Sequence, residues 1–128
     1  MIYGVGTDIV AIDRMEAAWA RHGERLARRI LMPAELEEFH RRGGGGRFLA
    51  KRFAAKEAAA KALGLGFRHG LALRHVGVDH EAEGRPYLVW DGRGRELLAE
   101  RGVAEGFLSI ADERDHAIAF VTLTRDRP

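Results

Sequence analysis

The first apolar stretch of the chain covers residues 2–12 and consists mainly of β-branched and other apolar residues, with Gly4 and Gly6 among them. This composition predicts a β-strand. Asp8 is its one acidic residue. An ionised carboxylate in a half-buried strand is costly unless a cation or several hydrogen-bond donors meet it. Asp8 therefore has two interpretations, an aspartate at a strand end that accepts backbone hydrogen bonds or a ligand for a cation.

The apolar positions change to helical spacing over residues 14–30. They form one stripe, typical of the core-facing side of a helix: Met15, Trp19, Leu26 and Ile30. We therefore expect a single helix over this segment. Proline is tolerated in a first turn, so a second, short helix is predicted over residues 33–41.

The alanine-rich segment 48–63 contains no glycine or proline and is the strongest helix prediction of the chain, with Gly64 as its stop. Four glycines, residues 43–46, precede it and predict a connection without side chains to hold it. Phe53, Glu57 and Lys61 are spaced i, i+4, i+8 and share one helix face, which Arg52 and Lys56 adjoin. Glu57 and Lys61 on this face form either a surface ion pair or a functional pair, in which a ligand for a hard cation lies next to an ammonium group and both point at a phosphate. The spacing leaves both interpretations open.

The second half of the chain predicts strands joined by short turns. The predicted strands are 71–79, 85–90, 107–111 and 117–124, and the predicted helix is 95–101. Glu83 and Gly84 mark a hairpin between the first two strands. Short connections favour antiparallel pairing. We therefore expect an α+β fold, with helices packed on a mostly antiparallel sheet, in one domain over residues 1–128.

Composition excludes several classes of protein. With 46% hydrophobic and 31% charged residues the chain predicts a folded domain, and no apolar run approaches the ~20 residues of a membrane span. It contains no cysteine, its six histidines lack zinc-binding spacing, and its N-terminus lacks the features of a secretory signal. We expect a cytoplasmic protein without a membrane partner. Ser109 is the only serine and lies outside any GxSxG motif, which argues against an acyl-enzyme, and neither a dinucleotide fingerprint nor a P-loop is present.

The basic residues of the chain are mostly arginine. Of 21 basic residues only three are lysine. Arginine suits phosphate and carboxylate partners, although a GC-rich genome would also supply it in place of lysine. Four arginines of the first predicted helix fall within a narrow arc: Arg14, Arg21, Arg25 and Arg28. This arginine stripe is either a solvated face or a docking surface for an acidic partner.

Several segments together closely resemble the small bacterial 4'-phosphopantetheinyl transferases of the holo-acyl-carrier-protein synthase type. They are Gly4-Val5-Gly6-Thr7-Asp8-Ile9-Val10 with Arg14, residues 48–58, Lys61-Ala62-Leu63-Gly64, Gly84-Arg85-Pro86 and residues 108–112. The resemblance covers residues 2–124, and the motif around Lys56 and Glu57 is its most specific part.

The resemblance implies transfer of 4'-phosphopantetheine from coenzyme A to a serine of apo acyl carrier protein, in fatty acid biosynthesis, with release of adenosine 3',5'-bisphosphate. It implies Mg²⁺ as cofactor, bound by Asp8 and Glu57, and a role for Lys61 in stabilising or protonating the leaving phosphate. It implies a homotrimer with active sites between subunits. The acceptor serine belongs to the carrier protein, so this chain needs no nucleophile of its own.

The resemblance also implies two binding surfaces. The acidic carrier protein would meet the arginine stripe. The coenzyme A contacts would be Arg47, Arg52, Lys61, Gly64 and Pro86. One position departs from the pattern: many relatives have a histidine where this chain has Asp112, and a carboxylate cannot donate a hydrogen bond to a phosphate, so no catalytic role is carried onto it.

The rival class is a non-enzymatic, arginine-rich module that binds RNA or an acidic protein. It would explain the arginine stripe, but neither Asp8 within a strand nor the face formed by Phe53, Glu57 and Lys61. Aromatic residues for base stacking are few, since Trp19 lies on the apolar stripe. We therefore expect no nucleic-acid partner.

Overall fold

The computed structural model describes residues 1–126 as five strands and five α-helices with one short 3₁₀ helix. In chain order these are β1 (Ile2–Ala11), α1 (Ile12–His22), α2 (Glu24–Ile30), α3 (Pro33–Arg41), α4 (Gly46–Leu63), the 3₁₀ helix (Leu73–His75), β2 (Val76–His80), β3 (Pro86–Trp90), α5 (Arg93–Arg101), β4 (Glu105–Asp112) and β5 (His116–Thr124).

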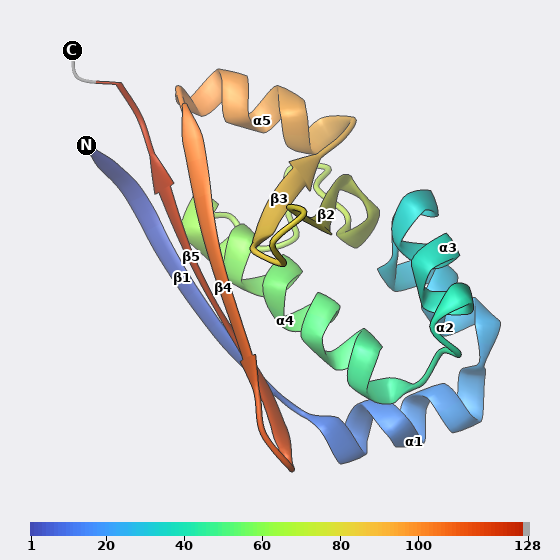
Figure 1. The fold of residues 1–128 in the computed structure, drawn as a ribbon. Helices are drawn as coiled ribbons and strands as arrows, with labels where there is room; N and C mark the ends of the chain where they lie inside the picture. Colours follow the sequence, from blue (N-terminus) through green and yellow to red (C-terminus); the bar gives the residue numbers. More distant parts are fainter. Residues whose placement is uncertain (127–128) are drawn as a thin grey trace.

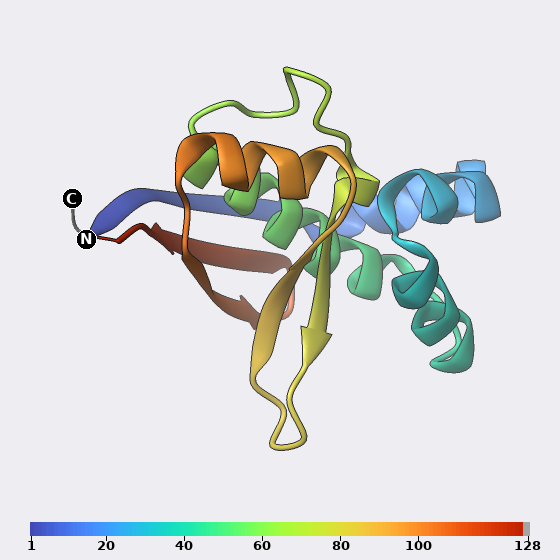
Figure 2. The same ribbon diagram turned by 90° about the horizontal axis from the view of Figure 1, so that it is seen from above.

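The α+β architecture expected from the sequence is confirmed. Strands β1, β5 and β4 form an antiparallel sheet in that order, and β2 and β3 form a separate antiparallel hairpin. Helix α4 crosses one face of the three-stranded sheet, whereas no helix of residues 1–126 covers the other face (Figure 1). Helices α1 to α3 gather at one end of α4, and the β2–β3 hairpin extends away from the sheet (Figure 2).

Helix α4 and β1 lie unusually close because β1 has glycine at two of its helix-facing positions. A Cβ atom at Gly4 would collide with the carbonyl oxygen of Ala62, and one at Gly6 with that of Ala58. The pleat of the strand puts Gly4, Gly6 and Asp8 on the same side, toward α4. The close approach therefore brings Asp8 to the helix that carries Glu57 and Lys61.

Substituting Gly6 by Ala is expected to destabilise the protein by about 1–3 kcal/mol, the usual cost of overpacking a well-packed core. The new methyl group meets backbone atoms of α4, which cannot rotate out of the way. Chemical denaturation of the purified variant measures the change. An unchanged denaturation midpoint would contradict the tight packing of β1 on α4.

Four predicted elements differ in the structure. The single helix expected over residues 14–30 is wrong, because Gly23 adopts φ 57° and ψ −137° and separates α1 from α2. The strand expected from residue 71 begins only at Val76, after the 3₁₀ helix. Helix α5 begins two residues before the expected start at residue 95. Helix α4 begins at Gly46, two residues before the expected start and within the predicted glycine connection. Helix α3 and the Gly64 stop of α4, in left-handed conformation at φ 83°, are confirmed.

Within residues 1–126, no helix combines the length and the apolar character needed to cross a membrane.

Candidate active site

Asp8 lies in the middle of β1, opposite Ala119 of β5, and not at a strand end. Its carboxylate accepts a hydrogen bond from the ammonium group of Lys61, with 3.0 Å between Oδ1 and Nζ. The same ammonium donates to the carbonyl oxygen of Thr7 at 3.0 Å. The structure therefore does not place Asp8 at a strand end, and its carboxylate meets the ammonium group of Lys61.

Lys61 lies in the last turn of α4, and its side chain is half exposed. The sequence left open a surface pair between Glu57 and Lys61. The ion pair in the structure is instead with Asp8, so it joins the sheet to the helix. Two hydrogen bonds to neighbouring residues of β1 hold an otherwise flexible side chain in one direction.

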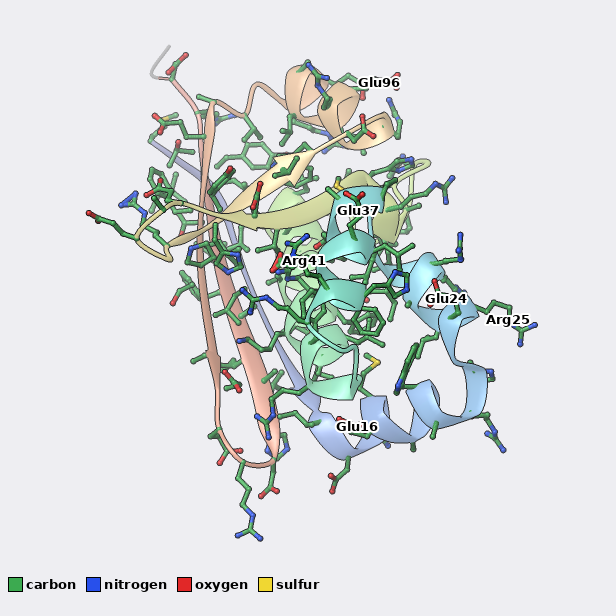
Figure 3. All side chains as sticks on the ribbon, turned by 45° about the vertical axis from the view of Figure 1, so that its right-hand side comes forward. Glu16, Glu24, Arg25, Glu37, Arg41 and Glu96 are labelled. Atoms are coloured by element: carbon green, nitrogen blue, oxygen red, sulfur yellow. The ribbon has the colours of Figure 1, made fainter. Side chains whose placement is uncertain are left out.

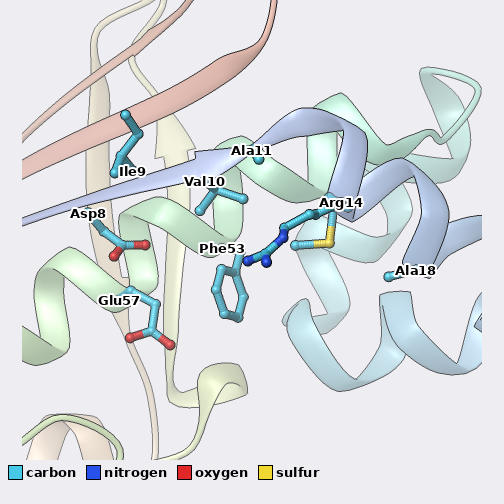
Figure 4. Close-up of a pocket in the computed structure, with 9 residues that line it drawn as sticks. Asp8, Ile9, Val10, Ala11, Arg14, Ala18, Phe53 and Glu57 are labelled. Atoms are coloured by element: carbon cyan, nitrogen blue, oxygen red, sulfur yellow. The ribbon is translucent and has the colours of Figure 1, made fainter.

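Glu57 lies one turn before Lys61, and its carboxylate faces the same hollow as that of Asp8 (Figure 4). Partial burial raises the pKa of Glu57, and the nearby charge of Asp8 raises it further, while Lys61 partly offsets both effects. The two carboxylates therefore repel each other in the protein alone. A bound divalent cation would relieve this repulsion.

The hollow continues from the carboxylates over an apolar floor to Arg14 of α1 (Figure 4). Its lining residues are Asp8, Ile9, Val10, Ala11, Arg14, Met15, Ala18, Phe53 and Glu57. The apolar lining from α1 was not predicted as part of a site, because Met15 carried the same signal as a core residue. A negative end, an apolar floor and a positive end thus line one shallow hollow.

The donor set fits a magnesium ion. Mg²⁺ in proteins is usually held by one or two carboxylates, with water and substrate phosphate as the other ligands. Asp8 and Glu57 supply two carboxylates that already face the same space. No cluster of three or more His, Cys, Asp or Glu residues suited to a metal occurs in the described part of the chain.

Lys56 and Arg52 turn away from this hollow into a buried ionic network. The Lys56 ammonium is fully buried, and its Nζ lies 2.6 Å from Oε1 of Glu35. Burial lowers the pKa of Lys56, which the Glu35 carboxylate opposes. The Arg52 guanidinium donates to Glu35 and to Glu38 of α3 at 3.2–3.3 Å and stacks on the Phe48 ring. The network joins α4 to α3 and to Val78 of β2, and no local pattern of residues predicts it.

A second, basic groove lies on another side of α4. It is lined by Arg42, Gly44, Arg47, Phe48, Lys51, Arg52, His80, Glu81, Ala82, Gly84 and Ile110. The structure therefore brings together two of the coenzyme A candidates, Arg47 and Arg52, although the donors of Arg52 are occupied by the buried network. Gly64 ends α4 three residues after Lys61, and Pro86 begins β3. The hollow and the groove share no lining residue.

The arginine stripe lies on two helices and not on one, because the chain turns at Gly23. Arg14 and Arg21 belong to α1, whereas Arg25 and Arg28 belong to α2. Arg28 pairs with Glu24 at 3.3 Å, and Arg25 extends outward from α2 (Figure 3). The narrow arc predicted from a continuous helix is therefore wrong, although all four side chains are exposed.

Comparison with known proteins decides the family. Residues 4–121 match the 4'-phosphopantetheinyl transferase superfamily. The chain belongs to this superfamily. The curated holo-[acyl-carrier-protein] synthase of Nitrosococcus oceani is 54% identical over 127 residues, which cover 99% of this chain and 82% of the relative. The expectation of an enzyme, a phosphopantetheinyl transferase of the holo-acyl-carrier-protein synthase type, is confirmed by such relatives.

Solved structures of phosphopantetheinyl transferases share the fold. The crystal structure of holo-[acyl-carrier-protein] synthase from Neisseria meningitidis superposes with a TM-score of 0.92 at 43% identity, over 98% of this chain and all of that one. The Helicobacter pylori enzyme, solved in complex with coenzyme A, gives a TM-score of 0.82 at 26% identity over 94% of this chain and 99% of that one. This phosphopantetheinyl transferase therefore has the fold of these relatives over at least 94% of its chain.

Proposed function

We propose that this phosphopantetheinyl transferase moves 4'-phosphopantetheine from coenzyme A to a serine of an apo acyl carrier protein, with Mg²⁺, and releases adenosine 3',5'-bisphosphate. The observation that carries the proposal is the meeting of Asp8, Glu57 and Lys61 beside one hollow that ends at Arg14. The coenzyme A complex of the Helicobacter pylori relative supports the donor.

Asp8 and Glu57 would hold the magnesium ion. A bound Mg²⁺ would supply positive charge that offsets the charge developing on the pyrophosphate oxygens of coenzyme A. The two carboxylates come from a strand and a helix far apart in the sequence, and the close packing of β1 on α4 keeps them facing one space. Asp8 and Glu57 would thus supply negative charge to the metal, and the packing of β1 on α4 would hold them in place.

Lys61 would act on the leaving phosphate. Displacement at phosphorus moves negative charge onto the leaving oxygen, and a fixed ammonium group stabilises that charge or donates a proton to it. The hydrogen bonds from Nζ to Asp8 and to the Thr7 carbonyl hold the ammonium beside the hollow before substrate binds. Gly64, Arg47 and Pro86 remain proposed contacts to the rest of coenzyme A, and Arg52 would act there only by supporting the groove wall.

The arginine stripe would dock the acidic carrier protein. Arg14 borders the hollow itself, so a carrier held there would have its acceptor serine near the carboxylates. Arg21 and Arg25 extend the positive surface along α1 and α2. In this arrangement charge complementarity selects the partner, and the hollow receives the reacting group.

Reversing Arg14 and Arg21 to Glu should raise the KM for carrier protein by at least about tenfold, because like charges would then meet at the docking surface. The KM for coenzyme A should barely move. Wild-type activity should also fall with added salt, which screens exposed charges beyond about 8 Å at physiological ionic strength. Steady-state kinetics with each substrate varied in turn test this. An unchanged KM for carrier protein in the double variant would mean that the arginine stripe is only a solvent-exposed face and not a docking surface.

The uncovered face of the three-stranded sheet supports a homotrimer. It carries exposed apolar side chains, a pattern that marks interaction surfaces: Val5, Ile9, Phe107, Ile118 and Phe120. The hollow and the basic groove lie on different sides of one chain, so an assembly that sets the groove of one subunit beside the hollow of the next would join the two halves of a coenzyme A site. Active sites between subunits would follow from such an assembly.

Replacing Phe120 by Asp should convert the trimer to a monomer and remove most transferase activity. The side chain lies on the outer face of β5, so its replacement disturbs assembly more than folding. Light scattering coupled to size-exclusion chromatography measures the mass, and Val89→Asp on the β2–β3 hairpin is the matched control that should stay trimeric. A wild-type protein that runs as a monomer would contradict the proposal.

Release of adenosine 3',5'-bisphosphate tests the proposed reaction. Chromatography should detect this nucleotide only when the enzyme, coenzyme A, Mg²⁺ and an apo acyl carrier protein are all present. A carrier protein whose acceptor serine is replaced by alanine is the control and should give none. Nucleotide release without the carrier, or none with all components present, would contradict the proposal.

A further inference from the structure

Asp112, at the end of β4, does not line the basic groove itself but forms ion pairs with two cations that do. Its Oδ2 accepts a hydrogen bond from Nη1 of Arg47 at 2.8 Å, and its Oδ1 lies 3.5 Å from Nζ of Lys51. The hydrogen bond from Arg47, followed by the charge of Lys51, lowers the pKa of Asp112. The Asp112 carboxylate is therefore ionised at neutral pH.

The other cations of the groove already have carboxylate partners. Arg42 pairs with Glu38 at 3.3 Å, and Arg52 pairs with both Glu35 and Glu38 in the buried network. The pKa of His80 is lowered by partial burial and then by Arg52, so its ring is uncharged near neutral pH. Arg47 and Lys51 are thus the groove cations that Asp112 neutralises.

We propose that Asp112 is an affinity-setting residue: a built-in anion that occupies Arg47 and Lys51 and so weakens the hold of the basic groove on a phosphate group. An incoming phosphate must share these two cations with a carboxylate of the same sign. The effect of Asp112 on phosphate binding is therefore unfavourable, and its removal should tighten binding.

The alternative role, in which Asp112 positions Arg47 for the phosphate, is disfavoured by the other contacts of that guanidinium. Arg47 also donates to the carbonyl oxygens of Glu113 at 2.8 Å and Arg114 at 3.1 Å. These two backbone partners in the β4–β5 turn hold the side chain without Asp112. Loss of the carboxylate charge would then leave Arg47 in place with its positive charge less compensated.

The inference rests on the proposed function in one respect, namely that the phosphate belongs to coenzyme A and to the nucleotide product. That product carries phosphates at two positions and leaves the enzyme in every cycle. A groove that binds it weakly releases it sooner. Asp112 would therefore favour product release at the cost of some substrate affinity.

Isothermal titration of adenosine 3',5'-bisphosphate into wild type and Asp112→Asn tests the proposal. The variant should bind about three- to tenfold more tightly, the scale of one partly exposed charge interaction. The gain should shrink at high salt and should be smaller with adenosine 5'-monophosphate, which lacks the second phosphate. Asp112→Glu, which keeps the charge, should bind as wild type does.

Glu113→Gln is the matched control. It removes one negative charge from the same turn, but the Glu113 carboxylate accepts hydrogen bonds from the backbone of Asp115 and His116 and not from Arg47. Its affinity should therefore stay near that of wild type. An equal gain in Glu113→Gln would mean that overall charge, and not the groove, sets the affinity, and would overturn the proposal.

Equal or weaker binding by Asp112→Asn, with a thermal midpoint like that of wild type, would also overturn the proposal. Wild-type transferase activity, measured in parallel, separates this failure from failure of the proposed function. An active wild type whose nucleotide affinity does not respond to Asp112→Asn rejects only the role of Asp112. An inactive wild type rejects the proposed function.

Discussion

Replacing Lys61 by Met is expected to lower kcat by about 10²-fold or more, the usual scale for loss of one preorganised donor at a developing charge. Methionine keeps the helix and much of the side-chain volume but removes the ammonium group that is hydrogen-bonded to Asp8 and to the Thr7 carbonyl. Binding of coenzyme A should weaken less than kcat falls. Single-turnover kinetics combined with equilibrium binding separate the two effects.

A normal kcat in Lys61→Met would leave Lys61 as a structural partner of Asp8 only. Lys61→Arg provides a second readout, because it keeps the positive charge and changes its shape and pKa. A kcat for Lys61→Arg that lies between those of Lys61→Met and wild type would support an electrostatic role of Lys61. Thermal midpoints of both variants near that of wild type would show that the loss is not unfolding.

Replacing Asp8 by Asn or Glu57 by Gln should each remove most transferase activity and most Mg²⁺ binding. Each change removes one of the two carboxylates that face the hollow, and neutral amides are weak ligands for Mg²⁺. Isothermal titration of Mg²⁺ in the presence of coenzyme A compares wild type with both variants. Undiminished metal binding in both would reject Asp8 and Glu57 as the ligands.

The stability of the metal-free protein should respond differently in the two variants. Glu57→Gln relieves repulsion from Asp8 and should be as stable as wild type or slightly more so. Asp8→Asn also relieves it but loses the ion pair with Lys61, which is half exposed and contributes little. Both variants should therefore fold, and the loss of activity can be assigned to the site.

The raised pKa of Glu57 sets the direction of the pH dependence. Between the ordinary carboxyl pKa of 4.5 and the raised value, the folded metal-free protein binds more protons at Glu57 than the unfolded chain does. The contribution of Glu57 to stability is therefore lost as pH rises through the raised value. Mg²⁺ binding has the opposite direction, since it needs the ionised carboxylate and weakens as pH falls. Glu57→Gln should remove this residue's part of both trends.

The helix that carries the site could be predicted from the sequence because its signals are local. Segment 48–63 has the alanine content, the absence of breakers and the Gly64 stop of a helix, and the spacing of Phe53, Glu57 and Lys61 fixes their common face. The meeting of Asp8 with that face is not local. It depends on how β1 packs on α4, and only the family resemblance indicated it beforehand.

The features that the sequence did not predict also depend on contacts between separate elements or on the conformation of one residue. One glycine within a helical pattern is compatible with an unbroken helix, so the periodicity of residues 14–30 did not reveal the turn at Gly23. The buried ion pairs of Lys56 and Arg52 with Glu35 were not predicted, because Glu35 lies on another helix. Spacing along one helix predicts which side chains are neighbours, but not which element packs against them.

The most direct test of the proposed transfer is the intact mass of an apo acyl carrier protein after incubation with this enzyme and coenzyme A. With Mg²⁺ present, the carrier should gain the mass of one phosphopantetheine group. It should gain none when Mg²⁺ is chelated or when Glu57→Gln replaces the wild type. If the carrier mass stays unchanged after incubation with the wild-type enzyme, coenzyme A and Mg²⁺, the proposed transfer is contradicted.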